Sequence, residues 1–297
     1  MIDSGVCLFA YSNQQLDYIK LAVLSAMSAK KQLNNIPVCL ITDTAGEKYM
    51  LKNIPKHVSC VFDHVIIAPA ADSQNIRLHF DSPWQKFYAD FKNRNKHLVY
   101  ELTPFNKTLL MDCDFLLYNN QYLNLFKSNT KLSMYKSAVD LVMSPPAAAE
   151  QRLNPKGIDM FWSTVVYFEK SKLSEIFFNL WAHISENYEF YTTRYQFPDG
   201  LFRTDFCVSI ASHIMADFSN NTFIQDMPDS PMTFMSQRDE IVNVSTDHSG
   251  LVLLSNNRKE QWRDIAVKHV NTNLHLMNKK SMLRHYDALL VSFQNEP

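Results

Sequence analysis

The sequence of 297 residues has 46% hydrophobic and 20% charged side chains, the balance of an ordinary globular protein that can bury a sizeable core. Its 29 Lys and Arg residues nearly match its 30 Asp and Glu residues, so the formal net charge is −1 and no global field attracts a polyanionic partner. A local basic face stays compatible with this balance, because net charge does not describe how charges are distributed.

Five cysteines are scattered along the chain without a C-x-x-C pair, which argues against the usual zinc and redox motifs. The N-terminus lacks a basic segment followed by an apolar one, so we expect a reduced, cytoplasmic setting. No apolar run approaches the roughly 20 residues that span a bilayer. With only five glycines, neither G-x-G-x-x-G nor G-x-x-x-x-G-K-[ST] occurs. A phosphate-binding site must therefore use a metal ion or side chains.

The N-terminal part of the chain alternates short apolar runs with a helical pattern. Residues 6–10 and 37–41 are continuous apolar runs that predict buried strands. Between them, apolar residues recur at helical spacing from 16 to about 33, and a third strand is predicted over 61–67. Strand, helix and strand in this order, with the strands apolar throughout, favour a parallel sheet covered on both faces.

The rest of the chain continues this α/β pattern. Residues 84–100 predict a helix, and 107–111 predict a fourth strand that runs directly into Asp112-Cys113-Asp114. Further along, the sequence predicts an apolar stretch over 161–168, helices over 176–184 and 205–215, and a short β segment over 241–244. No repeat or linker divides the chain, so we expect one domain over residues 1–297.

Asp112 and Asp114 stand where the predicted strand 107–111 ends. In open α/β sheets the ligand crevice lies beyond the carboxyl ends of the strands. Alternate residues of an extended segment point the same way, so both carboxylates can converge on one divalent cation. Mg²⁺ or Mn²⁺ prefers oxygen ligands and commonly shares its shell with substrate phosphates. The alternative is a chance Asp-x-Asp on a solvated turn, but the preceding strand and the apolar run at 115–117 favour a metal site.

The segment Thr103–Asp114, with its aromatic residue, lysine, strand and Asp-x-Asp, resembles that of GT-A glycosyltransferases related to glycogenin and the galactosyltransferases. This resemblance implies a Rossmann-like, mixed and mostly parallel sheet flanked by helices. It also implies an enzyme that transfers a hexosyl or pentosyl group from a nucleotide diphosphate sugar, with a UDP-sugar as the expected donor. The donor would bind with Mn²⁺ or Mg²⁺ at Asp112, Cys113 and Asp114. Residues up to about 120 correspond to the nucleotide-sugar-binding half, and 121–297 correspond to the acceptor half.

The same resemblance assigns further residues on the donor side. Ala10 and Tyr11, after the first strand, match the segment that holds the nucleotide base. Lys86 lies where the family often places a basic residue near the diphosphate. His275 and Lys279 resemble the late segment in which a histidine completes the metal shell and a lysine contacts the phosphates.

Each of these assignments has a structural alternative. Tyr11 is either a platform for a uracil ring or a hydrogen-bonded tyrosine at a strand end. Lys86 is otherwise a solvated helix residue, and His269 rivals His275 as the metal ligand. Asp43, at the end of the second predicted strand, either accepts a hydrogen bond from the base or ribose or caps a helix.

Asp199 and Asp205 are the candidate catalytic carboxylates. An inverting transferase needs a base that takes the acceptor proton, and a retaining one needs a nucleophile or a stabiliser of oxocarbenium-like charge. Asp205 also opens a predicted helix, so stabilisation of the helix N-terminus competes with catalysis. Residues 161–166 resemble the acceptor strand of the family, with Trp162 and Thr164 in place of the usual Asn and Gly. This match also gives Trp162 as a nucleotide-sugar-binding residue.

The acceptor is predicted from a second resemblance. The blocks Arg203–Phe206 and Ser209–Ala211 resemble GT-A-like proteins of large tailed phages, some of which glycosylate hydroxymethylated bases of the phage DNA. A cluster of basic residues late in the chain, together with Trp262, permits contacts to DNA phosphates. The alternative is that the cluster is a solvated surface. Its members are Arg258, Lys259, Arg263, Lys268, Lys279, Lys280 and Arg284. We therefore expect a hydroxymethyl pyrimidine in DNA as the acceptor. A glycan or protein acceptor and an inactive nucleotide-sugar-binding module are the alternatives, and the scarcity of glycine disfavours a nucleotidyltransferase.

Overall fold

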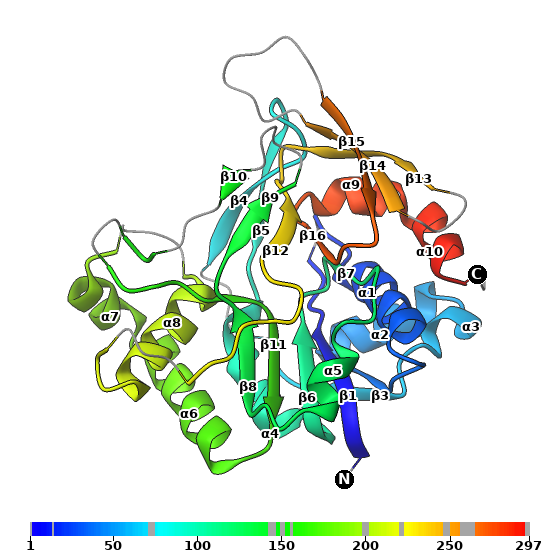
Figure 1. Ribbon diagram of the computed structural model, residues 1–297. Helices are drawn as coiled ribbons and strands as arrows, with labels where there is room; N and C mark the ends of the chain where they lie inside the picture. The colour runs from blue at the N-terminus through cyan, green and yellow to red at the C-terminus, as the bar shows by residue number, and fades with distance from the viewer. Residues whose placement is uncertain are drawn as a thin grey trace.

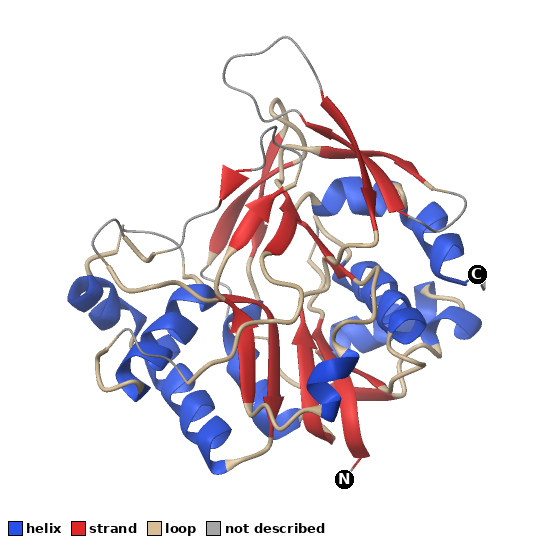
Figure 2. Cartoon of the chain, in the orientation of Figure 1, coloured by secondary structure: helices blue, strands red, loops and turns tan. Residues whose placement is uncertain are grey.

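The computed structural model describes residues 2–13, 15–70, 75–141, 147–148, 152–154, 157–197, 202–219, 223–245, 250–255 and 265–294. Within these residues, a six-stranded central sheet is flanked by helices and carries a second, smaller sheet at one end (Figure 1, Figure 2). No helix in these ranges is both long and apolar enough to cross a membrane.

The central sheet has the strand order β3-β2-β1-β6-β11-β8. Four of its strands run parallel: β1 (Ile2–Phe9), β2 (Val38–Thr42), β3 (His64–Ile67) and β6 (Phe105–Met111). The other two form an antiparallel extension, in which β11 (Trp162–Glu169) pairs with both β6 and β8 (Leu132–Tyr135). The mixed, mostly parallel α/β sheet expected from the sequence is therefore confirmed.

The apolar runs become the inner strands because helices cover them. Every residue of β2 is buried, as are the last four residues of β1 and of β6. In Figure 1, one group of helices lies on the side of β1–β3: α1 (Tyr18–Gln32), α2 (Thr44–Asn53) and α3 (Lys56–Ser59). Another group lies on the side of β8: α6 (Lys172–Glu186), α8 (Thr204–Met215) and, farther out, α7 (Tyr188–Tyr195). The helices predicted over 16–33, 176–184 and 205–215 correspond to α1, α6 and α8.

The second sheet brings a late part of the chain to the end of β6. Its order is β10-β9-β12-β16-β7, built from β10 (Ala147–Ala148), β9 (Ala138–Asp140), β12 (Met232–Met235), β16 (Leu274–Leu276) and β7 (Phe115–Leu116). Strands β7 and β16 pair antiparallel, with His275 opposite Phe115. Because Phe115 directly follows Asp114, this register places His275 beside the Asp-x-Asp triplet.

The predicted helix over 84–100 is wrong in its first half. Residues on both sides of a turn form a hairpin of β4 (Ile76–Phe80) and β5 (Lys86–Asp90), and only η1 (Asn93–Leu98) and α4 (Val99–Leu102) are helical. The hydroxyl of Ser82 accepts hydrogen bonds from the backbone N–H groups of Trp84 and Gln85, which closes the turn next to Pro83. The turn chemistry of Ser82-Pro83 therefore outweighs the helical spacing of the apolar residues.

The remaining elements lie in the later part of the chain, apart from α5 (Leu123–Lys127). Strands β13 (Glu240–Val244), β14 (Gly250–Ser255) and β15 (Ile265–Val270) form an antiparallel sheet, so the β segment predicted over 241–244 is confirmed. After β16 come α9 (Lys279–Arg284) and α10 (Tyr286–Gln294). The side chain of Asn278 accepts a hydrogen bond from the Ser281 backbone and caps α9, which fixes Lys279 at the start of that helix.

Candidate metal and nucleotide-sugar site

A cleft of about 350 Å³ opens at the carboxyl ends of β1 and β6, where the ligand crevice of such a sheet is expected. Its walls come from β4, η1, the Asp-x-Asp triplet, the start of β11, the start of α8 and the turn between β16 and α9. Among its described lining residues are five Lys or Arg side chains and three carboxylates: Arg77, Lys92, Lys96, Arg203, Lys279, Asp112, Asp114 and Asp205. The cleft is therefore lined by more positive than negative charge.

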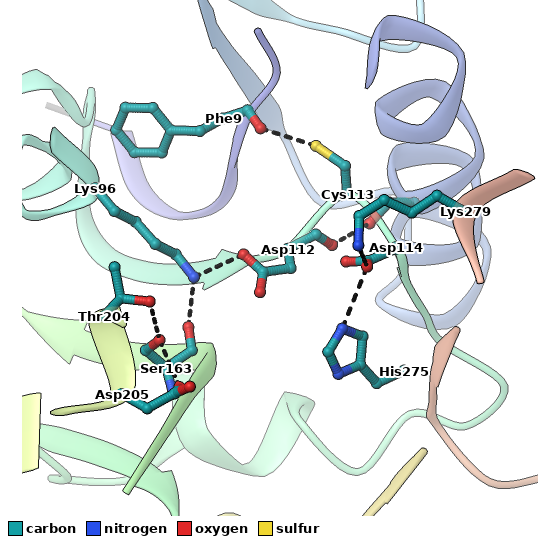
Figure 3. A network of polar contacts seen from close by, with 11 residues as sticks. Phe9, Lys96, Asp112, Cys113, Asp114, Ser163, Thr204, Asp205, His275 and Lys279 are labelled. Atoms are coloured by element: carbon teal, nitrogen blue, oxygen red, sulfur yellow. Dashed lines mark hydrogen bonds and ion pairs between the residues drawn. The ribbon is translucent and has the colours of Figure 1, made fainter. Parts of the chain in front are cut away.

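Lys96 holds the first carboxylate of the triplet. Its Nζ lies 2.7 Å from Asp112 Oδ1 and also donates to the carbonyl of Ser163 (Figure 3). Burial raises the pKa of Asp112 above its ordinary value, and the ammonium of Lys96 opposes that rise. The backbone N–H of Asp112 donates to the carbonyl of Thr164 at 2.9 Å. Asp112 is thus fixed where β6 and β11 diverge.

Asp114 is buried and faces two basic side chains. Its Oδ2 lies 2.6 Å from Lys279 Nζ and 3.3 Å from His275 Nε2 (Figure 3). Burial alone would raise the pKa of Asp114, but Lys279 and His275 hold it well below its ordinary range. Burial would likewise lower the pKa of Lys279, whereas Asp114 raises it above its ordinary value. Asp114 is therefore an ionised carboxylate at neutral pH.

The three residues predicted as metal ligands come together. Asp112, Asp114 and His275 each offer one ligand atom, and these atoms lie within 4.8 Å of one another. Two carboxylate oxygens and one imidazole nitrogen form a donor set suited to Mn²⁺ and compatible with Mg²⁺. The Nδ1 atom of His275 is buried and has no hydrogen-bond partner among the described residues. A divalent cation therefore fits this group of side chains.

Cys113, between the two carboxylates, ties the triplet to the first strand. Its thiol donates to the carbonyl of Phe9 at 2.9 Å, and burial raises its pKa well above the ordinary value. The residue lines the cleft but stays a neutral thiol. Cys113 therefore positions its two neighbours.

Asp205 lies in the first turn of α8, but its side chain does not cap that helix. Its Oδ1 accepts hydrogen bonds from the backbone N–H and the hydroxyl of Ser163 at 2.8 and 2.9 Å. Its Oδ2 lies 3.3 Å from the guanidinium of Arg203. Burial would raise the pKa of Asp205, but Arg203 and Ser163 together lower it below the ordinary value. Asp205 is thus an ionised carboxylate at the cleft wall, linked to Lys96 through Ser163 (Figure 3).

Two aromatic residues predicted from the sequence line the cleft. Tyr11 and Trp162 are almost completely buried, and the Tyr11 hydroxyl and the Trp162 Nε1 have no hydrogen-bond partner among the described residues. The Trp162 ring stacks on Phe234, with ring centroids 6.4 Å apart. The hydrogen-bonded alternative for Tyr11 is therefore not what the structure shows.

Three other predicted binding residues do not line this cleft. Ala10 is buried, and its carbonyl accepts a hydrogen bond from Thr42. Asp43 caps α2 by accepting from the Gly46 backbone at 2.7 Å, which supports the capping alternative. Lys86 is an exposed residue of β5 rather than of a helix, and the lysine that contacts Asp112 is Lys96.

Several predicted residues lie outside the described part of the chain. They are Asp199, Arg258, Lys259, Trp262 and Arg263, and the side chains of Lys268 and His269. The described members of the basic cluster contact other parts of the protein. Lys279 pairs with Asp114, Lys280 lies over the Phe87 ring at 3.9 Å, and Arg284 pairs with Asp81 and Glu240. They do not form an open basic face.

Sequence reasoning missed Lys96, Ser163 and Arg77. Lys96 and Arg77 are isolated basic residues without a recognisable motif, and the incorrect first half of the helix over 84–100 hid the hairpin that precedes η1, the short helix that carries Lys96. Ser163 becomes a site residue through backbone geometry, because the pairing of β11 with β8 changes register between Trp162 and Val166. That irregularity has no sequence signal of its own.

Comparison with known proteins finds no family model that matches and no curated protein that matches. Among solved structures, the galactosyltransferase LgtC with donor and acceptor sugar analogues gives a TM-score of 0.48 at 12% identity, covering 99% of this chain and 97% of that one. The glycosyltransferase GlyE of Streptococcus pneumoniae TIGR4 gives 0.41 at 10% identity, covering 76% of this chain and 46% of that one. A putative glucose-1-phosphate thymidylyltransferase from Bacillus anthracis gives 0.41 at 7% identity, covering 75% and 87%. The chain thus spans less than half the length of GlyE, and these similarities are too distant to assign it to a family.

Proposed function

We propose that the protein is a metal-dependent glycosyltransferase that uses a nucleotide diphosphate sugar, with a UDP-sugar as the donor. The convergence of Asp112, Asp114, His275 and Lys279 at the carboxyl ends of the strands carries this proposal. A departing diphosphate must have its charge neutralised, and the chain has no glycine-rich phosphate cradle. The mixed sheet with an Asp-x-Asp at a strand end is also the arrangement that the resemblance to GT-A enzymes implies.

In this proposal, Asp112, Asp114 and His275 hold Mn²⁺ or Mg²⁺, which neutralises negative charge on the leaving diphosphate. Lys279 stands next to Asp114 and donates to a phosphate oxygen when the donor enters. Tyr11, on the β1 side of the cleft, offers its ring to the base.

Asp205 is the carboxylate that we assign to the reacting sugar. Because its pKa lies below the ordinary value, it is ionised and is no proton donor at neutral pH. It either takes the acceptor proton or stabilises oxocarbenium-like charge. Ser163 and Arg203 fix its position for either role.

Slow hydrolysis of a UDP-sugar in the absence of acceptor tests this function. We expect UDP release with Mn²⁺, loss of release in EDTA, and loss in Asp112→Asn but not in Asp63→Asn, which lies outside the cleft lining. Release that persists in EDTA contradicts the metal site. Metal-dependent UDP binding without any release identifies an inactive binding module instead.

The hydroxyl acceptor that we propose is a hydroxymethyl pyrimidine in DNA, on the strength of the sequence resemblance alone. The described basic residues add no support, since each is engaged within the protein. A rate of transfer to a hydroxymethylated duplex that falls steeply between about 50 and 200 mM salt supports DNA, because added salt reduces the free energy gained when the protein releases counterions from the duplex. Transfer only to glycans or peptides contradicts the DNA acceptor and leaves the glycosyltransferase assignment intact.

A further inference from the structure

Arg77 is a charged residue of the cleft that the donor site described above does not use. It lies on β4 and lines the cleft together with His79. Its guanidinium lies over the Phe91 ring, 3.3 Å from the centroid, and donates to the carbonyl of Phe202. These two contacts fix the side chain in one orientation.

No carboxylate pairs with Arg77 within the described residues. Each of the three carboxylates of the cleft already faces a lysine or another arginine: Asp112 faces Lys96, Asp114 faces Lys279, and Asp205 faces Arg203. The Nε atom of Arg77 is buried and has no hydrogen-bond partner there. A guanidinium has five N–H donors, so the described residues leave most of its hydrogen-bonding capacity unused.

The electrostatic setting of Arg77 also favours an anion. Burial lowers the pKa of Arg77 to about 10, with only partial compensation from Tyr18 and Asp205. Burial also lowers the pKa of His79, to about 4, so the neighbouring imidazole is neutral at neutral pH and adds no second positive charge beside Arg77. A partly desolvated cation without a counter-ion is stabilised by a bound anion.

Arg77 lies near both ends of the cleft, because its charge acts on Tyr18 and His79, as do the charges of Lys279 and Asp114. Its guanidinium is anchored on Phe202, next to the Arg203–Asp205 pair at the start of α8. The diphosphate end has its own lysine, Lys279, beside Asp114. The planar guanidinium fork matches a carboxylate or a phosphate. Because Lys279 already serves the diphosphate end, a carboxylate at the sugar end is the ligand that remains for Arg77.

We propose that Arg77 binds the carboxylate of an acidic sugar, on the donor or on the acceptor, and so makes the protein selective for uronic-acid-type substrates. This inference rests on the proposed glycosyltransferase function. The carboxylate would accept two hydrogen bonds from the guanidinium, while Phe91 and Phe202 hold the guanidinium in place.

Calorimetric binding with matched pairs of ligands tests the proposal. In the donor arm, UDP-glucuronic acid is compared with UDP-glucose in Mn²⁺. In the acceptor arm, methyl glucuronide is compared with methyl glucoside on the protein saturated with UDP. We expect the acidic member of one arm to bind about ten- to a hundredfold more tightly, the range of a charge-assisted hydrogen bond.

Arg77→Gln should remove this preference and leave the affinity for the neutral member unchanged. Arg77→Lys, which keeps the charge but loses the fork, should retain part of the preference. The matched control is Arg238→Gln: Arg238 also stacks on a ring of β4, Phe80, but lies outside the cleft lining. It should keep the full preference.

Two results overturn the inference. Equal affinity for both members in both arms of the wild type shows that Arg77 selects no carboxylate. An equal loss of the acidic and the neutral donor in Arg77→Gln shows that Arg77 holds the diphosphate instead. In both cases UDP still binds with Mn²⁺ and the proposed function stands; if UDP does not bind at all, the proposed function fails and this inference fails with it.

Discussion

At the scale of single residues, the site depends on charges that are buried but compensated. Lys96 is 2% exposed and places its ammonium between Asp112 and the Ser163 carbonyl. Removing one partner of a buried pair leaves the other charge without compensation, which costs more than the pair itself contributes.

Lys96→Met should therefore lower the free energy of unfolding by about 1 to 3 kcal/mol, between the values for an exposed and a buried ion pair, because Lys96 is buried but 29% of the Asp112 side chain is exposed. The control is Lys30→Met, because the Lys30–Asp63 pair is equally short, at 2.7 Å, but more exposed. An exposed pair contributes below about 1 kcal/mol. Urea denaturation of both variants measures the difference, and equal losses would contradict the role given to Lys96.

The sequence was informative about individual residues only where spacing and chemistry agreed. Asp112, Asp114 and His275 were predicted as a group, and the structure brings them together. Lys86 was predicted from its position relative to the triplet, and it lies on an exposed strand instead. A lysine carries no signal that distinguishes a buried ammonium from a solvated one.

At the scale of elements, the start of β2 and the start of β3 are joined to α1 by one carboxylate. Asp63 accepts hydrogen bonds from Lys30 of α1 and from the backbone N–H of Val38, the first residue of β2. Burial would raise the pKa of Asp63, but these hydrogen bonds lower it below the ordinary value. The carboxylate therefore stabilises the fold only in its ionised form.

This lowered pKa predicts a pH dependence of stability. The contribution of Asp63 is fully present above the unfolded-state pKa of about 3.9 and is lost as pH falls through the lower folded-state pKa. The difference in free energy of unfolding between wild type and Asp63→Asn should thus be constant from pH 7 to about 5 and shrink at lower pH. Denaturant titrations across that range measure it, and a difference that grows on acidification contradicts the assignment.

Elements with a local signal were predictable, and elements defined by distant pairing were not. The apolar runs of β1, β2 and β6 identified the sheet, because strands covered on both faces are apolar throughout. The three-residue strand β16 has no such pattern, and its place beside β7 depends on a partner far away in the sequence. That pairing is nevertheless what positions His275.

At the scale of the whole molecule, the candidate metal group joins distant parts of the chain. Asp112 and Asp114 follow β6 of the central sheet, whereas His275 belongs to β16 of the second sheet. A cation that binds all three residues connects the two sheets. Because a ligand that binds only the folded state stabilises that state, the cation should raise the stability of the protein.

Mn²⁺ should accordingly raise the melting temperature of the wild-type protein. At a concentration 100 times the dissociation constant, the gain is about 2.7 kcal/mol. His275→Ala should lose most of this gain, because one of the three ligands is missing. The control is Asp43→Asn, because the Asp43 carboxylate caps α2 and does not belong to the metal group. This variant should keep the full gain in stability. An identical gain in His275→Ala places the cation elsewhere.

The central claim is that the Asp-x-Asp triplet binds a cation and that this cation binds a diphosphate. The affinity of the protein for UDP tests this claim most directly. Isothermal titration of UDP into the wild-type protein and Asp114→Asn, each with Mn²⁺ and with EDTA, separates the two steps. We predict that Mn²⁺ tightens binding by the wild type at least about tenfold, the factor for 1.4 kcal/mol, and has no effect on Asp114→Asn. UDP affinity that is the same in Mn²⁺ and EDTA, or a metal effect that survives in Asp114→Asn, would contradict this account.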